Sequence, residues 1–350
     1  MTHSGTAFAV SPPLVRARLS RWSLAAVAAG AVAAALVLFA VTRMQGWVGF
    51  LLVAAGFYLV AQTAVSGLVE GSRRAKDRLA TSIVVACSCA ATLPLVAVLG
   101  FTVVKGIAVL NGSFLTHTMR GVAEQDPDGG IYHAIIGTLE QVGLATLIAV
   151  PFGLLVAIYL VEYSSGWLGR VVSFFVDVMT GLPSIVAGLF IFALWILALG
   201  QGFSGFAGSL ALTIIMLPTV VRSAEEMLKI VPDGLREGSY ALGVQKWVTV
   251  LRIVLPTALT GIVTGVMLAV ARVTGETAPL LLTVFGNPAL NVNPFSGAQA
   301  SLPLFVFGEA GLPNETAINR AWAAALVLIL VVLILTILAR VVARLASVRS

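Results

Sequence analysis

The residues best suited to chemistry in this chain are a charged pair, Arg272 and Glu276, inside the otherwise uncharged stretch 258–285. That stretch is long enough to cross a bilayer, where one charge at mid-membrane costs roughly 2.5–3.5 kcal/mol on insertion scales. Residues four apart on a helix share a face and lie about 6 Å apart. The pair is therefore either a salt bridge that neutralises itself or an anion site. In an anion site the planar fork of Arg272 would hold a tetrahedral oxyanion, and Glu276 would position or tune it.

The composition is that of an integral membrane protein. Of 350 residues, 59% are hydrophobic and 10% are charged, whereas a soluble domain carries about 25% charged residues. The net charge of +6 does not indicate nucleic-acid binding, because the basic residues fall in short segments between apolar runs. Cys87 and Cys89 lie two apart in one apolar run and are expected to be packing residues. We predict no metal site, because no other Cys or His falls at membrane depth.

Hydropathy along the chain predicts an all-α polytopic protein with eight membrane spans. The sixth predicted span is the weakest, because it is short and carries Pro218 near its end. When loops are assigned alternately to the two sides, sixteen basic residues fall on the side of both termini and four on the other. The positive-inside rule therefore predicts cytoplasmic N- and C-termini. The predicted spans are Leu24–Val41, Trp47–Val69, Leu79–Val104, Ile135–Val161, Val171–Leu199, Phe206–Val221, Ala258–Phe285 and Ala321–Leu345.

The chain divides into two parts that differ in intramembrane charges and in motifs. Residues 1–78 combine a cytoplasmic N-terminus with two spans that carry no intramembrane charge and no motif, and we interpret these spans as accessory helices. The basic run 71–78 separates them from residues 79–350, which are expected to form a core of six spans.

A polar stretch of 35 residues, 222–256, separates the sixth and seventh predicted spans. Its residues predict a short helix, a turn at Gly243 and a second helix that enters the membrane at Pro256. Connections of this length are uncommon in compact proteins and usually serve a function. We expect this stretch to dock a soluble partner on the cytoplasmic side, the alternative being an ordinary solvated loop.

This stretch resembles the EAA loop of ABC-importer permeases, which reads Glu-Ala-Ala, three residues, Gly, nine residues, Ile-x-Leu-Pro. Two small residues, Gly238 and Ser239, stand at the Ala positions. In that family the loop forms the coupling helix, which sits in a cleft of the ATPase subunit. The resemblance implies that the ATPase-coupling residues are Glu237, Gly238, Ser239, Ala241, Gly243, Ile253, Leu255 and Pro256.

Three further segments resemble the phosphate-specific members of that family: Gly129–Leu139, Gly181–Phe190 and Ala271–Leu280. The resemblance runs from about residue 79 to the C-terminus. It implies a six-span type I permease core, with the two leading helices as additions, and import of inorganic phosphate through a bacterial plasma membrane. It also implies that phosphate passes Arg272 and Glu276, and we place the nearby hydroxyls of Thr274 and Thr277 on the same pathway.

Glycines near the charged pair favour close helix packing. Gly261 and Gly265 have the Gly-x-x-x-Gly spacing that lets another helix approach. Gly275 lies between the two charges, where it would clear space beside them. The alternative for all three is generic helix packing.

The energy for transport must come from partners. The chain contains no Gly-Lys dipeptide and therefore no Walker A loop. We predict a transport subunit without an ATPase site and with no cofactor of its own, ATP and Mg being bound by a partner. The expected partners are a second permease subunit, two copies of a P-loop ATPase, an extracytoplasmic phosphate-binding protein near residues 287–319, inorganic phosphate and membrane lipid, without nucleic acid.

Two alternatives remain open. An ABC permease for molybdate or sulfate would share the coupling loop. An ion-coupled secondary transporter could use Arg272 and Glu276 as a proton or anion relay, but it would carry inverted repeats and would need no coupling loop.

Overall fold

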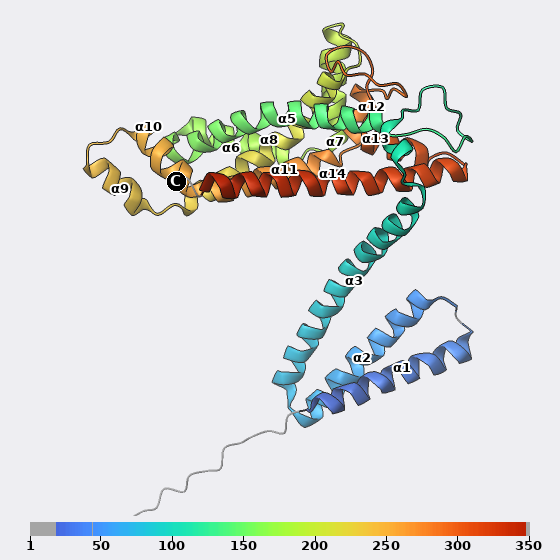
Figure 1. Cartoon of the computed structure of the whole chain (residues 1–350). Coiled ribbons are helices and arrows are strands. Elements are labelled where there is room, and N and C mark those ends of the chain that lie inside the picture. Colours follow the sequence, from blue (N-terminus) through green and yellow to red (C-terminus); the bar gives the residue numbers. More distant parts are fainter. Residues whose placement is uncertain (1–18, 44, 348–350) are drawn as a thin grey trace, which may run out of the picture. The chain divides into compact units, whose positions relative to one another are not determined.

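Helices make up almost all of the described chain, residues 19–43 and 45–347 of a computed structural model (Figure 1). Within these residues no strand forms, and one isolated β-bridge joins Phe285 and Gln299. In this described part of the chain, seven helices are long and apolar enough to cross a membrane, or eight if a bent pair counts as one span, so the all-α membrane fold is confirmed. The chain divides within α3 into unit 1, residues 1–99, and unit 2, residues 100–350. The boundary expected after residue 78 stays a prediction.

Unit 1 is a helical hairpin followed by the start of a long helix. Its elements are α1 (Arg21–Thr42), α2 (Trp47–Val69) and the first part of α3 (Ser72–Val109). Most of the basic run 71–78, expected as a separating segment, forms the first turns of α3, which begins at Ser72.

Glu70, between α2 and α3, is the polar centre of unit 1. Its buried carboxylate accepts hydrogen bonds from Leu19 N at 2.8 Å, Ser66 Oγ at 2.9 Å and Arg78 Nε at 2.7 Å. Chiefly because of the Arg78 hydrogen bond, the pKa of Glu70 is lowered from 4.5 to about 2. The stabilisation from these bonds is therefore complete above pH 4.5 and is lost only as the pH falls toward 2.

Unit 2 carries the permease-like part of the chain. Its helices after α3 are α4 (Gly112–Thr116), α5 (Tyr132–Ile158), α6 (Trp167–Thr180), α7 (Ser184–Ile191), α8 (Gly205–Ile230), α9 (Asp233–Ala241), α10 (Lys246–Thr249), α11 (Leu255–Thr274), α12 (Ala278–Thr283), α13 (Leu302–Ala310) and α14 (Glu315–Ser347). Three π-helical turns extend these helices: η1 (Tyr159–Tyr163) after α5, η2 (Phe192–Ala198) after α7 and η3 (Val250–Val254) between α10 and α11.

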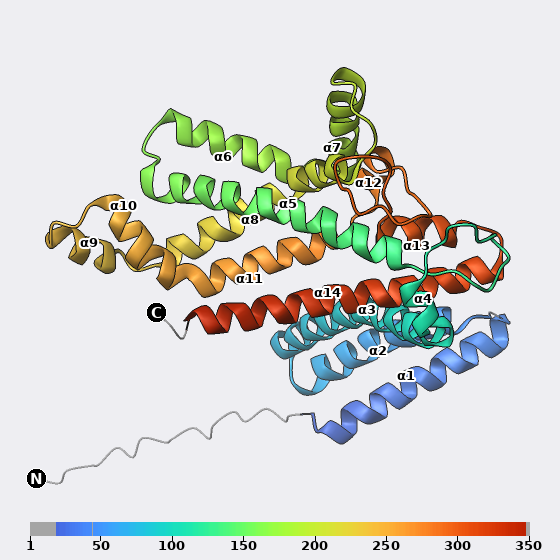
Figure 2. The same ribbon diagram turned by 45° about the horizontal axis from the view of Figure 1, so that its top comes forward.

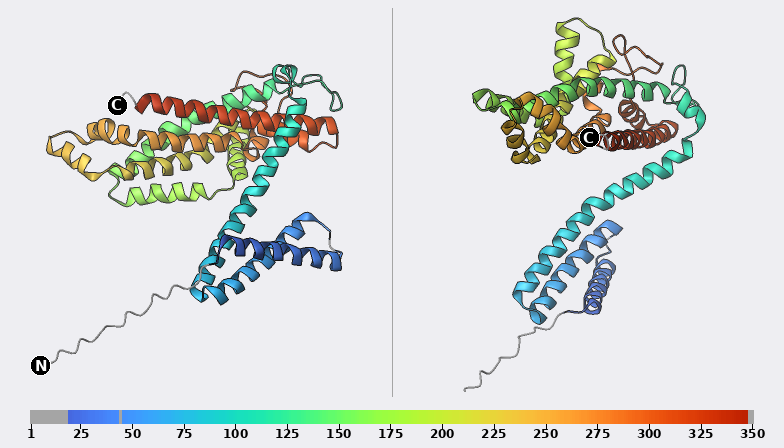
Figure 3. Two further views of the ribbon diagram at one scale, coloured as in Figure 1. Left: turned by 60° about the horizontal axis from the view of Figure 1, so that its bottom comes forward. Right: turned by 60° about the vertical axis from the view of Figure 1, so that its left-hand side comes forward.

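The long helices of unit 2 run side by side, and its connections collect at two ends. Helices α9 and α10 lie at the same end as the carboxyl end of α14, whereas α12 and α13 lie at the opposite end (Figures 1 and 2). The other two views show α11 running alongside α14, and the two helices are in contact (Figure 3). We call the first end the coupling end. The predicted topology requires residues 222–256 and the carboxyl end of α14 to lie at one end, as they do, and the membrane side of that end stays a prediction.

The fifth predicted span, 171–199, is not one straight helix. It forms α6 and the α7–η2 segment, which meet at an angle of 105°. Pro183 explains the break, because it has no backbone N–H to donate and it keeps Leu182 out of the helical conformation. This pair is therefore a broken span or a re-entrant loop.

The sixth predicted span, expected to be the weakest, is the most enclosed of the long helices. Helix α8 continues nine residues past the predicted end at Val221, and 56% of its most apolar window is buried. Residues 222–230, expected in a loop, are its last turns. Hydropathy stops at these charges, but Arg222, Glu225 and Lys229 pair along the helix, so the helix continues.

The core of unit 2 forms where α8 meets its neighbours. Small residues allow this close packing, because a Cβ at Gly153 of α5 would lie 2.7 Å from Val220 Cγ1 of α8. The largest buried cluster joins α5, α8, α11 and α12, through Val142, Ala145, Ala149, Leu212, Met216, Val220, Ala269, Val273, Leu280 and Val284.

A glycine of α5 tests this packing. A Cβ at Gly137 would lie 2.1 Å from the backbone oxygen of Ala300, whereas one at Gly143 of the same helix would meet nothing within 4 Å. Gly137→Ala should therefore destabilise the protein by about 1–3 kcal/mol, as overpacking does. The thermal midpoint of the detergent-solubilised protein should fall by several degrees.

Gly143→Ala is the matched control and should be neutral or slightly stabilising, since alanine is the better helix former. Equal midpoints for the two variants would contradict the close approach of Ala300 to α5.

Candidate translocation and coupling sites

The charged pair lies where α11 ends, not along one helix as the sequence suggested. Arg272 is in the last turn of α11, Gly275 is the C-cap, and Glu276 follows the cap. The predicted continuous span 258–285 breaks here because Pro279 lies in the first turn of α12, which starts a new helix. The turn still keeps the charges close, with Arg272 Nε 4.0 Å from Glu276 Oε1.

The pair is loose and open to the outside of this chain. The side chain of Arg272 is 59% exposed and that of Glu276 is 20% exposed. A 4.0 Å separation is too long for a hydrogen bond, and the described residues offer the guanidinium no other polar partner within bonding distance. The planar fork of Arg272 is therefore free to bind an anion.

The two threonines of this segment lie differently. Thr274 is 1% exposed, and its Oγ1 donates to Val270 O at 2.7 Å, so the hydroxyl faces its own helix. Thr277 is partly exposed and, with Gly275, lines a groove whose other wall is α13. The structure thus keeps Arg272 and Glu276 close together, places Thr277 in the groove beside α13, and leaves the hydroxyl of Thr274 bonded to its own helix.

The three glycines predicted to support helix packing also differ in what surrounds them. A Cβ at Gly261 would lie 2.2 Å from Met227 Sδ, and one at Gly265 would lie 2.4 Å from Ser223 Cβ, so both face α8 at close range. Gly275 differs, because a Cβ there would meet only the carbonyl oxygen of Arg272, at 3.7 Å. Gly275 ends the helix and packs against no other one.

The coupling segment forms two short helices joined by a tight turn, as its residues predict. Helix α9 ends at Ala241, Gly243 adopts φ +77°, and α10 starts at Lys246. Ser239 Oγ and Thr249 Oγ1 are buried and 2.8 Å apart, so the serine at an Ala position of the EAA pattern joins the two helices. The replacement of alanine by serine at this position of the pattern therefore has a structural role, because the serine hydroxyl contacts Thr249.

The predicted coupling residues divide into a surface set and a supporting set. Glu237, Gly238, Ala241 and Gly243 are exposed, beside Leu242, which is 84% exposed. Ser239 is buried, and the remaining residues, Ile253, Leu255 and Pro256, are half-buried in the helix that leads from α10 into α11.

Arg236 fixes the coupling segment to the bundle, a role that sequence reasoning missed. Its side chain donates to Leu228 O at 2.9 Å and Val231 O at 2.6 Å, which are carbonyls at the end of α8. It also donates from Nε to Glu162 Oε1 on η1 at 3.0 Å. The sequence offered one indication, the acidic Glu162 just after the fourth predicted span. Its partner could not be identified from the sequence, because Arg236 lies 74 residues away.

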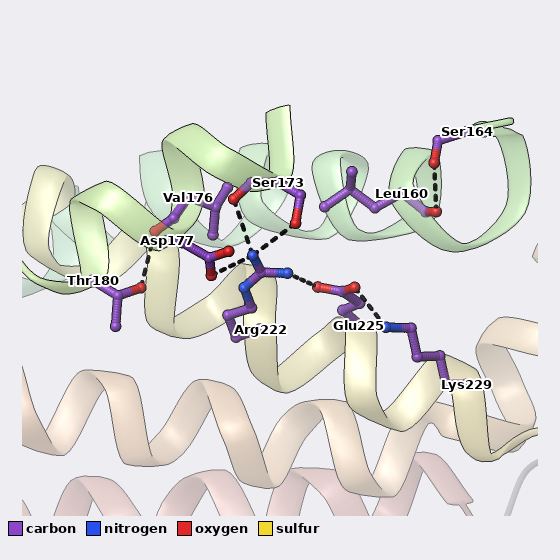
Figure 4. Close-up of polar contacts among 9 residues, drawn as sticks. All are labelled: Leu160, Ser164, Ser173, Val176, Asp177, Thr180, Arg222, Glu225 and Lys229. Carbon is purple, nitrogen blue, oxygen red and sulfur yellow. Dashed lines mark hydrogen bonds and ion pairs between the residues drawn. The ribbon is translucent and has the colours of Figure 1, made fainter. Parts of the chain in front are cut away.

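A second missed cluster joins α6 to α8 (Figure 4). Arg222 donates to Ser173 O at 3.0 Å and to Ser173 Oγ at 2.9 Å, and it forms ion pairs with Asp177 and Glu225. Asp177, 65% exposed, is a charge within the fifth predicted span. This charge in an apolar stretch is the sequence feature that could have indicated the cluster.

The end of unit 2 opposite the coupling end is held by polar side chains inside the bundle. Gln299, 1% exposed, donates to Glu140 and to Asn291 O and accepts from Gln141 Nε2 at 2.9 Å. The fully buried Arg320 of α14 donates to Glu309 Oε2 at 2.8 Å and to loop carbonyls of residues 124, 126 and 128. The connection 284–301, which overlaps the predicted binding-protein region 287–319, is thus anchored to α5.

No group of three or more His, Cys, Asp or Glu in the described ranges could hold a metal ion. Cys87 and Cys89 are free thiols on α3.

Comparison with known proteins identifies the class. A family model described as "Binding-protein-dependent transport system inner membrane component" matches residues 149–348, more than half of the chain. A solved structure of the MetNI methionine ABC transporter, in an inward-facing conformation, aligns with a TM-score of 0.53 at 21% identity, covering 62% of this chain and 95% of that one. This second likeness concerns the fold alone.

The chain belongs to this family of ABC-importer permeases, and within it to the PstA group, and is a multi-pass plasma-membrane transport subunit. Such a permease works with an ATPase and a substrate-binding protein. The phosphate transport system permease protein PstA 1 of Mycobacterium tuberculosis (strain ATCC 25618 / H37Rv) is 50% identical over 261 residues, covering 74% of this chain and 85% of the relative. The PstA proteins of Mycobacterium leprae (49% over 261 residues; 74% and 86% covered) and Yersinia pestis (40% over 271 residues; 77% and 90%) are also similar.

The turn at Gly243 generates a prediction about assembly. A side chain at φ +77° is strained by roughly 1–2 kcal/mol, and asparagine tolerates this conformation best. Gly243→Val should therefore misalign α9 and α10 and reduce co-purification of the partner ATPase at least severalfold, whereas Gly243→Asn should retain it.

Gly234→Ala is the control, because Gly234 is in α9, has open space around it and is not one of the predicted coupling residues. Equal ATPase recovery with Gly243→Val and Gly234→Ala would show that the turn does not shape the docking surface.

Proposed function

We propose that this chain is a transmembrane permease subunit of an ATP-driven importer of inorganic phosphate. It provides half of the translocation pathway and docks the ATPase through α9 and α10. The observation that carries the proposal is the open guanidinium of Arg272 on a membrane-spanning helix. The identity of 40–50% to PstA phosphate permeases, each covered over 85–90% of its length, supports phosphate as the substrate.

The charge on the anion explains why half a pathway is expected. Phosphate carries one to two negative charges at neutral pH, and one arginine neutralises only part of that charge. A second, PstC-like permease subunit would contribute its own cation across a pseudo-two-fold axis. Because Arg272 is exposed on this chain, a neighbouring subunit could complete the site. Glu276, 4.0 Å away, weakens the hold of Arg272, which suits passage because an ion must also leave.

The remaining components follow from what this chain lacks. Two PstB-like ATPase subunits would bind ATP and Mg and drive the cycle, since this chain has no Walker A loop. A PstS-like protein would deliver phosphate to the region 287–319. The assembled complex would be an ABC-type phosphate-transporting ATPase.

The two alternatives have less support. The PstA relatives are named for phosphate, which disfavours molybdate or sulfate as the substrate. The formed coupling helices α9 and α10 disfavour an ion-coupled transporter, which would not need them.

Substitution of the charged pair tests the proposal. Arg272→Gln should abolish phosphate uptake, and Arg272→Lys should impair it because an ammonium lacks the planar fork. Glu276→Gln should slow turnover, because Arg272 would then hold the anion more tightly. All three proteins should reach the membrane in normal amounts, as measured by immunoblot beside radiolabelled phosphate uptake.

Arg73→Gln, at an exposed arginine on α3 outside both candidate sites, is the charge-matched control and should transport normally. A purely structural salt bridge predicts a different result, because removing either partner would leave an unpaired charge and lower the amount of folded protein. Normal uptake by the Arg272→Gln protein would refute the anion pathway.

A further inference from the structure

One face of α11 is exposed and polar along most of the helix. Thr257, Thr260, Thr264, Leu268 and Arg272 are all exposed and recur every three or four residues, which places them on one helical face. We call these five residues the α11 face. It extends over 15 residue steps from the coupling end to the guanidinium, a length of about 22 Å.

The exposed face of α5 is different in kind. It presents large apolar side chains, including Leu147 (70% exposed), Phe152 (63%) and Leu155 (64%), as expected of a surface in contact with hydrocarbon. On the α11 face the only large apolar side chain is Leu268, 67% exposed.

Hydrocarbon is a poor environment for the α11 face. Lipid tails offer no hydrogen-bond partner to a guanidinium, and a charge among them costs several kcal/mol. The end of the face that carries Arg272 must therefore be turned toward water or toward another protein. Gly261 and Gly265 place α8 directly beside the α11 face, so one border of the face is a closely packed helix.

Two of the three threonine hydroxyls on this face donate hydrogen bonds to carbonyls of their own helix. Thr257 Oγ1 donates to Ile253 O at 2.6 Å, and Thr264 Oγ1 donates to Thr260 O at 2.8 Å. Their hydrogens are thus used, and their lone pairs are left to accept. Phosphate at neutral pH always carries at least one proton, so it can donate to these oxygens while Arg272 donates to its charged oxygens.

We infer that Thr257, Thr260 and Thr264 line the cytoplasmic half of the phosphate pathway and conduct the anion from Arg272 to the coupling end. This inference rests on the proposed function and adds the route to it. Neutral hydroxyls replace part of the hydration shell without holding the anion as a second cation would. Arg272 is the point of capture, and the threonines form the exit.

Thiol accessibility tests whether the α11 face is wet. Cys87 and Cys89 are first replaced by alanine in the assembled transporter. Thr260→Cys, Thr264→Cys and Leu268→Cys should then react with a small water-soluble thiosulfonate in inside-out vesicles at least about tenfold faster than Leu147→Cys on α5, because the reactive thiolate forms only in water. Inorganic phosphate should slow the reaction at positions 260 and 264.

Transport measurements test the hydroxyls themselves. The triple variant Thr257→Val, Thr260→Val, Thr264→Val keeps side-chain shape and should lower phosphate uptake at least about fivefold at unchanged membrane abundance. The corresponding triple serine variant should retain uptake. Thr336→Val is the matched control, because Thr336 on α14 donates to Val332 O at 2.7 Å and is not on the α11 face.

Two results would overturn the inference. Equally slow labelling at positions 260, 264 and 147 would make the α11 face a dry contact, and normal uptake by the triple valine variant would remove the hydroxyls from the pathway. If Arg272→Gln still abolished uptake, either result would leave the proposed function intact. It would reject only the route of phosphate along the α11 face. Normal uptake by Arg272→Gln would remove the proposed function itself.

Discussion

The cost of removing charge from water governs how this protein is built. In unit 2 that cost is offset because the arginines that the fold encloses use their N–H donors in hydrogen bonds and ion pairs. Arg236 binds two helix-end carbonyls and Glu162, Arg320 binds Glu309 and three loop carbonyls, and Arg222 joins α6 to α8. Each of these contacts also fixes one element to another, because the donors of one guanidinium reach several chain segments at once. Arg272 stands apart from these three, since its guanidinium is left without hydrogen bonds among the described residues.

The sequence predicted the membrane class, most spans and the coupling turn because these features depend on local properties. Apolar runs predict helices, and a glycine between two polar helical segments predicts a turn, which Gly243 forms at φ +77°. Hydropathy averages over a window and so missed local backbone constraints. Pro183 bends the fifth span, the Gly275–Pro279 segment ends the seventh, and charge pairing extends α8 beyond Val221.

The candidate sites were predictable to a different extent. Arg272 and Glu276 could be found because a charge in an apolar run is visible in the sequence, although their placement on one helix was wrong. The contacts of Arg236 with Glu162 and of Gln299 with Glu140 join residues 74 and 159 positions apart, and neither periodicity nor spacing indicates such pairs. The exposure of the α11 face is also a tertiary property, since it depends on which side of the helix α8 and α14 leave uncovered.

The helix that carries Arg272 is continuous with α10, which we propose docks the ATPase. From Lys246 through the π-helical turn η3 to Thr274 the chain forms one uninterrupted rod of 29 residues, a length of roughly 44 Å. Gly261 and Gly265 hold this rod against α8 near its middle, where it can act as a lever with its fulcrum at that contact. A tilt of this rod about that contact would displace α10 and Arg272 in opposite directions. One backbone element would thus convert the motor stroke into a change at the ion site without a relay of side chains.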